Sequence, residues 1–266
     1  MGAVIVTGGT FGIGKAITLT LAEKGYNVVA FGIESLQPSS TAENAIEPLR
    51  QELTEKRFTA DILEADVSKA EDVKRVVDFA LMRHGAIDGL VNNAAIGPLG
   101  SVPETSEDIW DQVIAVNLKG TFLCCKEVLQ HMTKQGYGSI INIGSGSGWG
   151  KPNMAAYSAS KGGIFALSAA LAYDHLAEGV RVNTVVPGGG GMFTGMSLGR
   201  RSGNEELIRN SASATPAGRP TDPTDIAKAV AFLLSDEAAV ISGTVIDVGC
   251  FAGQGGAVNT QKQKVV

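Results

Sequence analysis

Tyr157 and Lys161 carry the side chains best suited to moving a proton in this 266-residue sequence. They stand four positions apart in the segment Tyr-Ser-Ala-Ser-Lys, so on a helix they share one face. A free phenol titrates at about pH 10, and a nearby cation lowers that pKa because it favours the phenolate. Tyr157 is therefore predicted to act as a general acid or base beside Lys161. The alternative is an ordinary pair of surface side chains, which this motif alone does not exclude.

Other polar residues could complete such a site. Ser145 ends a strand-like run, where its hydroxyl could hydrogen-bond the carbonyl oxygen of a substrate, and Ser147 is the competing candidate. Asn117 falls inside a long helical pattern, where asparagine has a poor propensity. A capping or core role is the alternative for Asn117.

The segment 7–14, Thr-Gly-Gly-Thr-Phe-Gly-Ile-Gly, has the composition of a phosphate-binding loop. Gly8 permits a sharp turn, Gly12 lets the backbone approach a pyrophosphate, and Gly14 lets the following helix pack closely. The N-terminus of that helix would present backbone N–H groups to the anion. An ordinary glycine-rich turn between a strand and a helix is the alternative.

Short β-branched runs alternate with longer helical patterns along the chain. The expected strands are 3–6, 27–31, 62–65, 87–92, 139–143, 181–186 and 244–248, and the expected helices are 13–24, 42–56, 70–84, 106–135, 156–177 and 222–235. Several runs are continuously apolar, as in parallel strands covered on both faces. The pattern predicts an α/β fold: a Rossmann-like, doubly wound, seven-stranded parallel sheet between two helical layers. Residues 1–266 are expected to form one domain.

Composition narrows the classes of partner. The net charge is −5 and no block of five or six basic residues occurs, so binding to nucleic acid or to an anionic membrane is not expected. The three cysteines have no metal-ligand spacing, and no metal is predicted. No signal peptide or membrane-spanning run is found, which predicts a cytoplasmic protein.

Taken together, these residues resemble the short-chain dehydrogenase/reductase family, of the short single-domain type. The resemblance runs from Val4 to about Gly249. Its pieces occur in order: 7–14, Ala65-Asp66-Val67, 87–95, Asn117, Ser145, Tyr157 with Lys161, Arg181-Val182-Asn183, Pro187-Gly188 and Ile241-Ser242-Gly243. Each piece alone is weak evidence for the family, but their occurrence together in this order is specific to it.

The resemblance implies hydride transfer between a nicotinamide cofactor and a secondary alcohol or ketone. Tyr157 would exchange the proton, Lys161 would lower its pKa and bind the ribose, Ser145 would polarise the carbonyl, and Asn117 would hold a water in a proton relay. The cofactor-binding residues that it implies are Gly8, Thr10, Phe11, Gly12, Ile13, Gly14, Glu34, Asp66, Val67, Asn93, Ala94, Tyr157, Lys161, Pro187, Gly188, Gly190 and Thr194.

The residues after the second predicted strand favour NAD over NADP. Gly32 stands where NAD-dependent members usually have an aspartate, and Glu34 could replace it. No basic residue occurs between Gly25 and Leu49, so a 2′-phosphate would lack a partner there, with Lys15 as the possible exception.

The sequence says less about the substrate. The expected substrate residues are Ser145, Ser147, Trp149, Tyr157 and Phe193, with Gly97, Met154, Gly191, Met192 and Met196 as further pocket candidates. This mostly apolar set predicts a medium-sized ketone or secondary alcohol. The glycine-rich segment that begins at 188 predicts a substrate lid over about 189–213. Arg200 and Arg201 could meet an anionic substrate, but we favour a solvated helix start for them.

Several functions remain open at this point. The first is a ketone reductase or alcohol dehydrogenase, including a 3-oxoacyl carrier-protein reductase or a sugar or polyol dehydrogenase. The second is a regulator that senses NAD(H) without catalysis, and the presence of Tyr157, Lys161, Ser145 and Asn117 argues against it. The third is an extended-type sugar-nucleotide epimerase, for which too little sequence follows Tyr157. The resemblance also implies a homotetramer or homodimer built through helices 106–135 and 156–177.

Overall fold

The structure is a computed structural model that describes residues 2–33, 46–188, 192, 194–200, 203–206 and 215–249. Its centre is one seven-stranded sheet in the order β3-β2-β1-β4-β5-β6-β7, with every neighbouring pair parallel. The strands are β1 (Ala3–Thr7), β2 (Asn27–Gly32), β3 (Ala60–Glu64), β4 (Ile87–Asn92), β5 (Gly138–Ile143), β6 (Val180–Val186) and β7 (Val245–Asp247). The predicted doubly wound sheet is confirmed.

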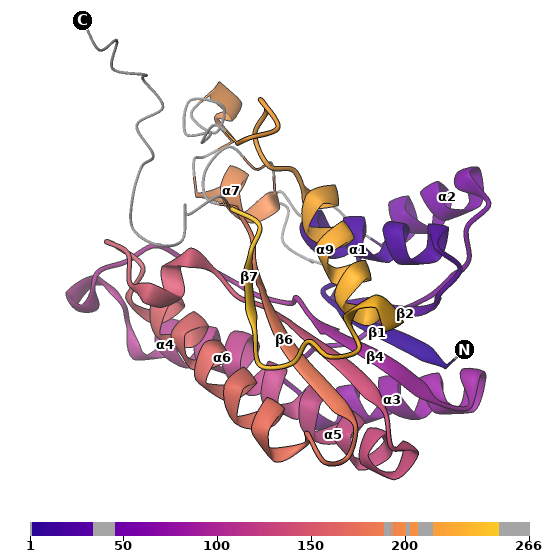
Figure 1. The fold of residues 1–266 in the computed structure, drawn as a ribbon. Helices are drawn as coiled ribbons and strands as arrows, with labels where there is room; N and C mark the ends of the chain where they lie inside the picture. Colours follow the sequence, from indigo (N-terminus) through magenta and orange to yellow (C-terminus); the bar gives the residue numbers. More distant parts are fainter. Residues whose placement is uncertain are drawn as a thin grey trace, which may run out of the picture.

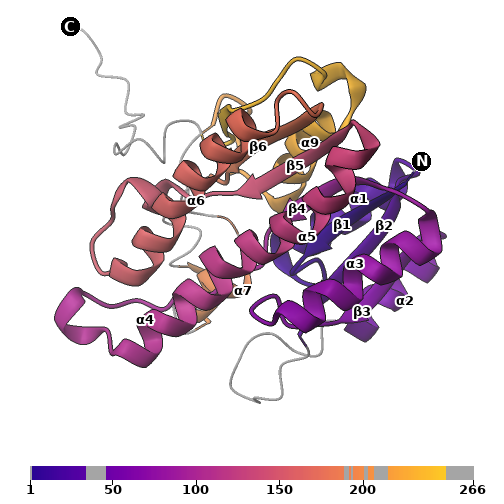
Figure 2. The same cartoon turned by 90° about the horizontal axis from the view of Figure 1, so that it is seen from below.

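Helices cover both faces of the sheet (Figure 1). One layer holds α1 (Gly12–Glu23), α2 (Ile46–Lys56) and α9 (Pro223–Leu234). The opposite layer holds α3 (Ala70–His84), α4 (Glu107–Ile114), α5 (Gly120–Gln135) and α6 (Ala155–Asp174). Seen from below, α3, α5 and α6 run across this second face (Figure 2). A short helix, α7 (Gly195–Gly199), follows β6.

Alternation along each strand explains the two layers. In β1, Val4 and Val6 belong to the core beneath α1 and α9, whereas Ala3 and Ile5 belong to the core beneath α3 and α5. Successive side chains of a strand point to opposite faces, so a strand that is apolar throughout is buried on both sides. Within the described ranges, no helix is long and apolar enough to span a bilayer.

The predicted helix 106–135 is interrupted. Between α4 and α5 the residues Ala115–Lys119 form a π-helical turn, in which the Gly120 N–H bonds to the Ala115 carbonyl. A Cβ added at Gly120 would lie 2.9 Å from Val67 Cγ2, so the helix passes very close to the loop after β3. Periodicity does not reveal such an insertion, which is set by tertiary contacts.

The strand order places a crevice beside β1. The chain leaves β1 for β2 and β3 on one side and then returns to β4 on the other side. The connections after β1 and β4 therefore diverge at the carboxyl ends of these strands. Ligands of open α/β sheets bind at such a switch point.

Candidate active site

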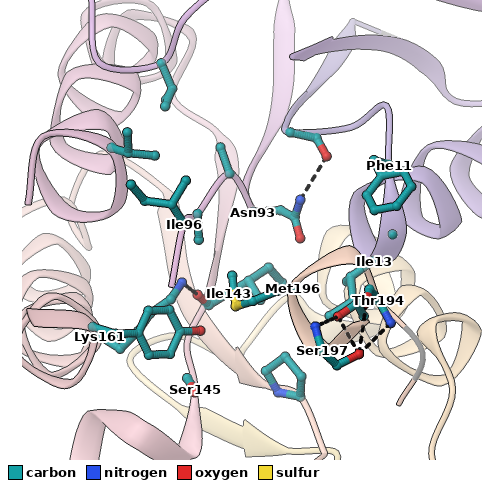
Figure 3. A pocket seen from close by; sticks show the side chains of 18 of the residues that line it. Phe11, Ile13, Asn93, Ile96, Ile143, Ser145, Lys161, Thr194, Met196 and Ser197 are labelled. Carbon is teal, nitrogen blue, oxygen red and sulfur yellow. Dashed lines mark hydrogen bonds between the residues drawn. The ribbon is translucent and has the colours of Figure 1, made fainter. Parts of the chain in front are cut away.

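A cavity of about 830 Å³ opens at the carboxyl ends of the strands. The predicted residues that line it are Gly8, Thr10, Phe11, Gly12, Ile13, Asp66, Val67, Asn93, Ala94, Ser145, Ser147, Met154, Tyr157, Lys161, Pro187, Gly188, Met192, Thr194 and Met196. Figure 3 shows Lys161 and Ser145 on one side of it and Phe11, Ile13 and Thr194 on the other. The fold therefore brings most of the predicted catalytic and cofactor residues to one place.

Some predicted residues are not among those that line the cavity. Glu34, Gly190, Gly191 and Phe193 lie outside the described residues, as does much of the predicted lid. Gly14, Gly97, Asn117 and Trp149 are described but do not line the cavity.

The loop after β1 has the backbone of an anion cradle. Gly8 and Gly12 adopt φ angles of 57° and 54°, the left-handed region that favours glycine. A Cβ added at Gly14 would overlap the Gly8 carbonyl oxygen, so Gly14 lets α1 begin directly against the loop. The N-cap residue of α1, Phe11, makes no side-chain capping bond, so its first turn keeps N–H groups for an anion. These features fit a dinucleotide pyrophosphate.

Asn93 holds this loop in place. Its Nδ2 donates to the carbonyl oxygens of Thr7 and Gly8, at 3.1 and 3.0 Å. The Thr7 hydroxyl in turn accepts from the backbone N–H groups of Asn93 and Ala94. The resemblance implies that Asn93 contacts the adenosine ribose. In the structure its side-chain amide hydrogen-bonds the loop between β1 and α1 and so stabilises the conformation of that loop.

Gly14→Ala is expected to raise the Kd for the nucleotide by about 10- to 100-fold, because the added methyl would displace the loop and overpacking costs about 1–3 kcal/mol. Calorimetric titration with the nucleotide measures the change. Gly25→Ala is the matched control at the far end of α1. Gly25, unlike Gly14, has a positive φ, and it has nothing within 4 Å of an added Cβ, so only stability should fall. Unchanged nucleotide affinity in Gly14→Ala would argue against the cradle.

Helix α6 carries the predicted proton donor and its cation. Tyr157 and Lys161 are only 7% and 3% exposed, and both line the cavity. Lys161 Nζ donates to the Ile143 carbonyl at the end of β5, at 2.7 Å, and lies 5.9 Å from the centre of the Tyr157 ring. The predicted pairing of the two side chains on one helical face is present.

The structure also distinguishes Ser145 from Ser147. The Ser147 hydroxyl is buried and donates to Met154 Sδ at 3.2 Å. Ser145 is less buried, and its hydroxyl side chain hydrogen-bonds the Tyr157 phenol. Ser145 is therefore the serine placed to meet a carbonyl oxygen next to the proton donor.

Burial and neighbouring charges set the ionisation of this site. Burial raises the pKa of Tyr157 above its usual value, opposed by the charge of Arg200 and by hydrogen bonds from Ser145 and Arg200. Burial alone lowers the pKa of Lys161 to about 8. The resemblance predicts that Lys161 lowers the tyrosine pKa, but Arg200 and Ser145 do so in the structure, since the Lys161 ammonium points to the Ile143 carbonyl. The Tyr157 phenol is protonated at neutral pH, as a proton donor in ketone reduction must be.

The side-chain amide of Asn117 bonds to protein groups, and the predicted relay water at Asn117 stays a prediction. Asn117 is fully buried, and its Oδ1 accepts from the Ile96 N–H at 2.9 Å. Its Nδ2 donates to the Ile96 carbonyl and to the Ser160 hydroxyl, at 2.9 and 3.0 Å. The side-chain amide thus joins the end of β4 to α6, and Asn117 is a positioning residue for the helix that carries Tyr157.

Trp149, an expected substrate residue, is not among the residues that line the cavity. Its indole is 50% exposed and stacks on Phe165, with 4.6 Å between ring centres. Trp149 ends the 3₁₀ turn Gly146–Trp149, in which Ser145 is the N-cap residue. The turn directs the serine into the cavity and the indole away from it.

The interpretation of Arg200 as part of a solvated helix start is wrong. Arg200 is the C-cap residue of α7 and lines the cavity. Its Nε donates to the Gly97 carbonyl at 2.8 Å, and its Cζ lies 4.7 Å from the centre of the Tyr157 ring. One signal could have identified it: Arg200 follows the predicted pocket residue Met196 by four positions. Arg201 lies outside the described residues.

Within the described part of the chain, no group of three or more His, Cys, Asp or Glu side chains could hold a metal ion. Cys124 and Cys125 are free thiols buried beneath the sheet, and burial raises the pKa of both. The ionisable side chains that line the reacting end of the cavity are Lys151, Tyr157, Lys161 and Arg200.

The chain is similar to known proteins over nearly its whole length. The family model described as Enoyl-(Acyl carrier protein) reductase matches residues 8–250. The 2-(S)-hydroxypropyl-CoM dehydrogenase 3 of Xanthobacter autotrophicus is 39% identical, over 92% of this chain and 94% of its own length. The 3-oxoacyl-(acyl-carrier-protein) reductase FabG of Staphylococcus epidermidis is 35% identical, over 92% of this chain and 96% of its own.

A crystal structure of a variant of actinorhodin polyketide ketoreductase with NADPH has a TM-score of 0.83 at 30% identity. The match covers 96% of this chain and 98% of the ketoreductase. The family model and the relatives cover nearly all of the chain and are enzymes by name, which argues against a regulator without catalysis. The chain therefore belongs to the short-chain dehydrogenase/reductase family and is an NAD(P)-dependent oxidoreductase that interconverts CH–OH and keto groups.

Proposed function

We propose that the protein is an NAD-dependent reductase of a small or medium-sized ketone, and the dehydrogenase of the matching secondary alcohol, with Tyr157 as the acid/base. The observation that carries this proposal is the buried Tyr157 phenol, which lies in the nucleotide-sized cavity beside Ser145, Lys161 and Arg200. A bound nicotinamide nucleotide supplies or accepts the hydride, and the protein supplies the proton and the orientation.

Each side chain of the site has a separate role in ketone reduction. Ser145 donates a hydrogen bond to the substrate oxygen, which stabilises the negative charge that develops there. Tyr157 donates its phenolic proton to the same oxygen. The hydrogen bond from Ser145 favours the phenolate that remains. The Lys161 ammonium, anchored on the Ile143 carbonyl, would bind the nicotinamide ribose. In alcohol oxidation the same groups run in reverse, and Tyr157 accepts the proton.

The adenosine end of the cavity supports NAD as the cofactor. A Cβ added at Gly32 would lie 2.7 Å from Thr10 Oγ1, so Thr10 occupies the space that the usual aspartate would need, and the preference for NAD comes instead from the lack of cations among the described residues at this end. Ile33, the next lining residue, is apolar and 62% exposed. Lys15 does not line the cavity and forms an ion pair with Glu52 at 2.6 Å. Among the described lining residues, the cations are Lys151, Lys161 and Arg200, all toward the reacting end.

The function and the cofactor can be tested in one assay. A panel of ketones, 3-oxoacyl thioesters and polyols is offered with NADH or NADPH (NAD or NADP for the polyols), and the absorbance of the reduced nicotinamide is followed. We expect turnover of at least one ketone, with kcat/KM for NADH about tenfold or more above that for NADPH, since a buried phosphate without a cationic partner is costly. A preference for NADPH would refute the cofactor proposal. Failure of the whole panel would refute the activity.

A 3-oxoacyl thioester is the second candidate substrate. The FabG relative is named for this chemistry. Met154, Met192 and Met196 line the cavity and could accommodate an acyl chain, which also disfavours a polyol. Turnover of a 3-oxoacyl thioester in preference to simple ketones would select this candidate.

We further propose a homodimer or homotetramer. Large apolar side chains are exposed on α4 and α5, among them Ile109, Trp110 and Phe122. We interpret them as part of the interface, because exposed apolar patches mark such sites. Light scattering is expected to give two or four times the mass of the chain, and a monomer would contradict the proposal.

A further inference from the structure

Among the described residues, Arg200 is a cation over the catalytic phenol for which the reaction described above needs no substrate contact. Its guanidinium carbon lies 4.7 Å from the centre of the Tyr157 ring, and the side chain lines the cavity. Reduction of a neutral ketone needs a proton donor and a group that polarises the carbonyl, and Tyr157 and Ser145 supply these. Arg200 opposes the rise in the pKa of Tyr157, and its position in the cavity also lets it contact a substrate.

The surroundings of Arg200 hold it in one orientation. Nε donates to the Gly97 carbonyl at 2.8 Å, and a Cβ added at Gly97 would overlap the guanidinium and approach Met196 Sδ to 2.9 Å. Any side chain at position 97 would therefore push Arg200 off the phenol. The absence of a side chain at Gly97 provides the space that the guanidinium fills.

Most of the described charged side chains that line the cavity are cations. Lys151 and Lys161 line the same cavity as Arg200. Among the described residues that line the cavity, the only carboxylate is Asp66, which follows β3, four strands away from β5 in the sheet. Asp66 Oδ1 also accepts from the Ser68 N–H and hydroxyl, at 2.9 and 2.7 Å. The chain has a net charge of −5, yet three of the four described charged side chains that line the cavity are cations.

We propose that Arg200 binds the carboxylate of a small oxo acid, placing the keto group of that acid against Tyr157 and Ser145. A guanidinium presents its donors in a fork that matches a carboxylate, and such charge-assisted bonds are the strong ones. Because Arg200 lies against the phenol itself, the carboxylate would lie only a few bonds from the keto carbon, as in 2-oxo and 3-oxo acids. This inference rests on the proposed function and specifies its substrate class.

The test compares acetoacetate with methyl acetoacetate, which differ in charge and share the keto group. With the wild-type enzyme, acetoacetate is expected to be the better substrate. Arg200→Gln is expected to lower kcat/KM for acetoacetate by about 10- to 100-fold relative to methyl acetoacetate, as expected for a lost hydrogen bond to a charged group. Gly97→Ala keeps the charge and displaces it, so it should shift the ratio in the same direction. Equal losses of kcat/KM on both substrates would overturn the proposal. They would mean that Arg200 supports the catalytic residues in general and does not bind the carboxylate of the substrate.

Arg219→Gln is the matched control. Arg219 pairs with Asp225 at 2.7 Å and is not a lining residue of the cavity, so the ratio of the two substrates should not change. If this variant shifts the ratio as much as Arg200→Gln does, general electrostatics explain the effect and the proposal is wrong.

A binding measurement separates this inference from the proposed reaction. Acetoacetate is titrated calorimetrically into the enzyme with NAD, which cannot reduce it. Saturable binding by the wild type that is weakened about tenfold or more in Arg200→Gln supports the assignment of Arg200 even if no turnover is found and the proposed reaction fails. Absence of binding in the wild type, or equal binding in both proteins, overturns it.

Discussion

Tyr157→Phe is expected to lower kcat for ketone reduction by about 10³- to 10⁴-fold, the upper range for the loss of a positioned general acid. The change removes only the hydroxyl. The ring is 7% exposed and lies beneath the Arg200 guanidinium, so phenylalanine can fill the same space. The phosphate cradle is built from the loop after β1 and from Asn93, and nucleotide affinity should remain within about threefold. Stopped-flow turnover and nucleotide titration measure the two quantities.

Tyr173→Phe on the same helix is the matched control for this prediction. Tyr173 is 85% exposed, and the change there should leave both quantities as in the wild type. Turnover by Tyr157→Phe within tenfold of the wild type would remove Tyr157 from the proposed role. Loss of nucleotide binding in that variant would instead show that the hydroxyl supports the architecture of the site.

The parts of the site that the sequence predicts best are those with local requirements. Tyr157 and Lys161 share a face because a helix returns to the same side every three or four residues, so their spacing is sufficient evidence. Gly8 and Gly12 occupy backbone conformations that favour glycine, and the contacts of Gly14 leave no room for a side chain. The alternating strands and helices likewise predict a parallel sheet from local pattern alone.

The parts that the sequence did not predict depend on contacts between distant segments. Arg200 is 103 residues from Gly97, whose carbonyl orients it, and no sequence pattern links the two. Trp149 is a plausible substrate residue by type, but the turn that presents Ser145 directs the indole onto Phe165. Asn117 suits a site by its poor helix propensity, and the structure shows that its amide joins Ile96 to Ser160.

Lys161→Met is expected to lower kcat by about 10³-fold and to stabilise the fold at neutral pH. The loss of activity follows because Lys161 lines the cavity beside Tyr157, where its ammonium would bind the nicotinamide ribose and so orient the cofactor against the proton donor. The gain in stability follows from the pKa of Lys161, which burial lowers from 10.5 to about 8. Holding this charge in the folded state costs about 3 kcal/mol at pH 7. Loss of the 2.7 Å bond to the Ile143 carbonyl offsets part of the gain, so the expected net is about 1–2 kcal/mol.

The stability advantage of Lys161→Met over the wild type is expected to depend on pH. Between about pH 8 and 10.5 the unfolded wild type binds a proton at Lys161 that the folded wild type has released, so wild-type stability rises with pH over this range. The methionine variant has no such group. Its advantage in urea unfolding should therefore be full below about pH 8 and should disappear as the pH approaches 10.5.

Lys74→Met is the matched control, since Lys74 is exposed and its ion pair with Asp78 lies on the surface of α3. Its stability should change by no more than about 0.5 kcal/mol at pH 7. A Lys161→Met variant that is less stable than the wild type at pH 7, or whose advantage does not change with pH, would mean that the buried ammonium is not held at a cost. The expected opposite changes in stability and activity would instead show that the fold keeps a costly buried charge where the reaction uses it.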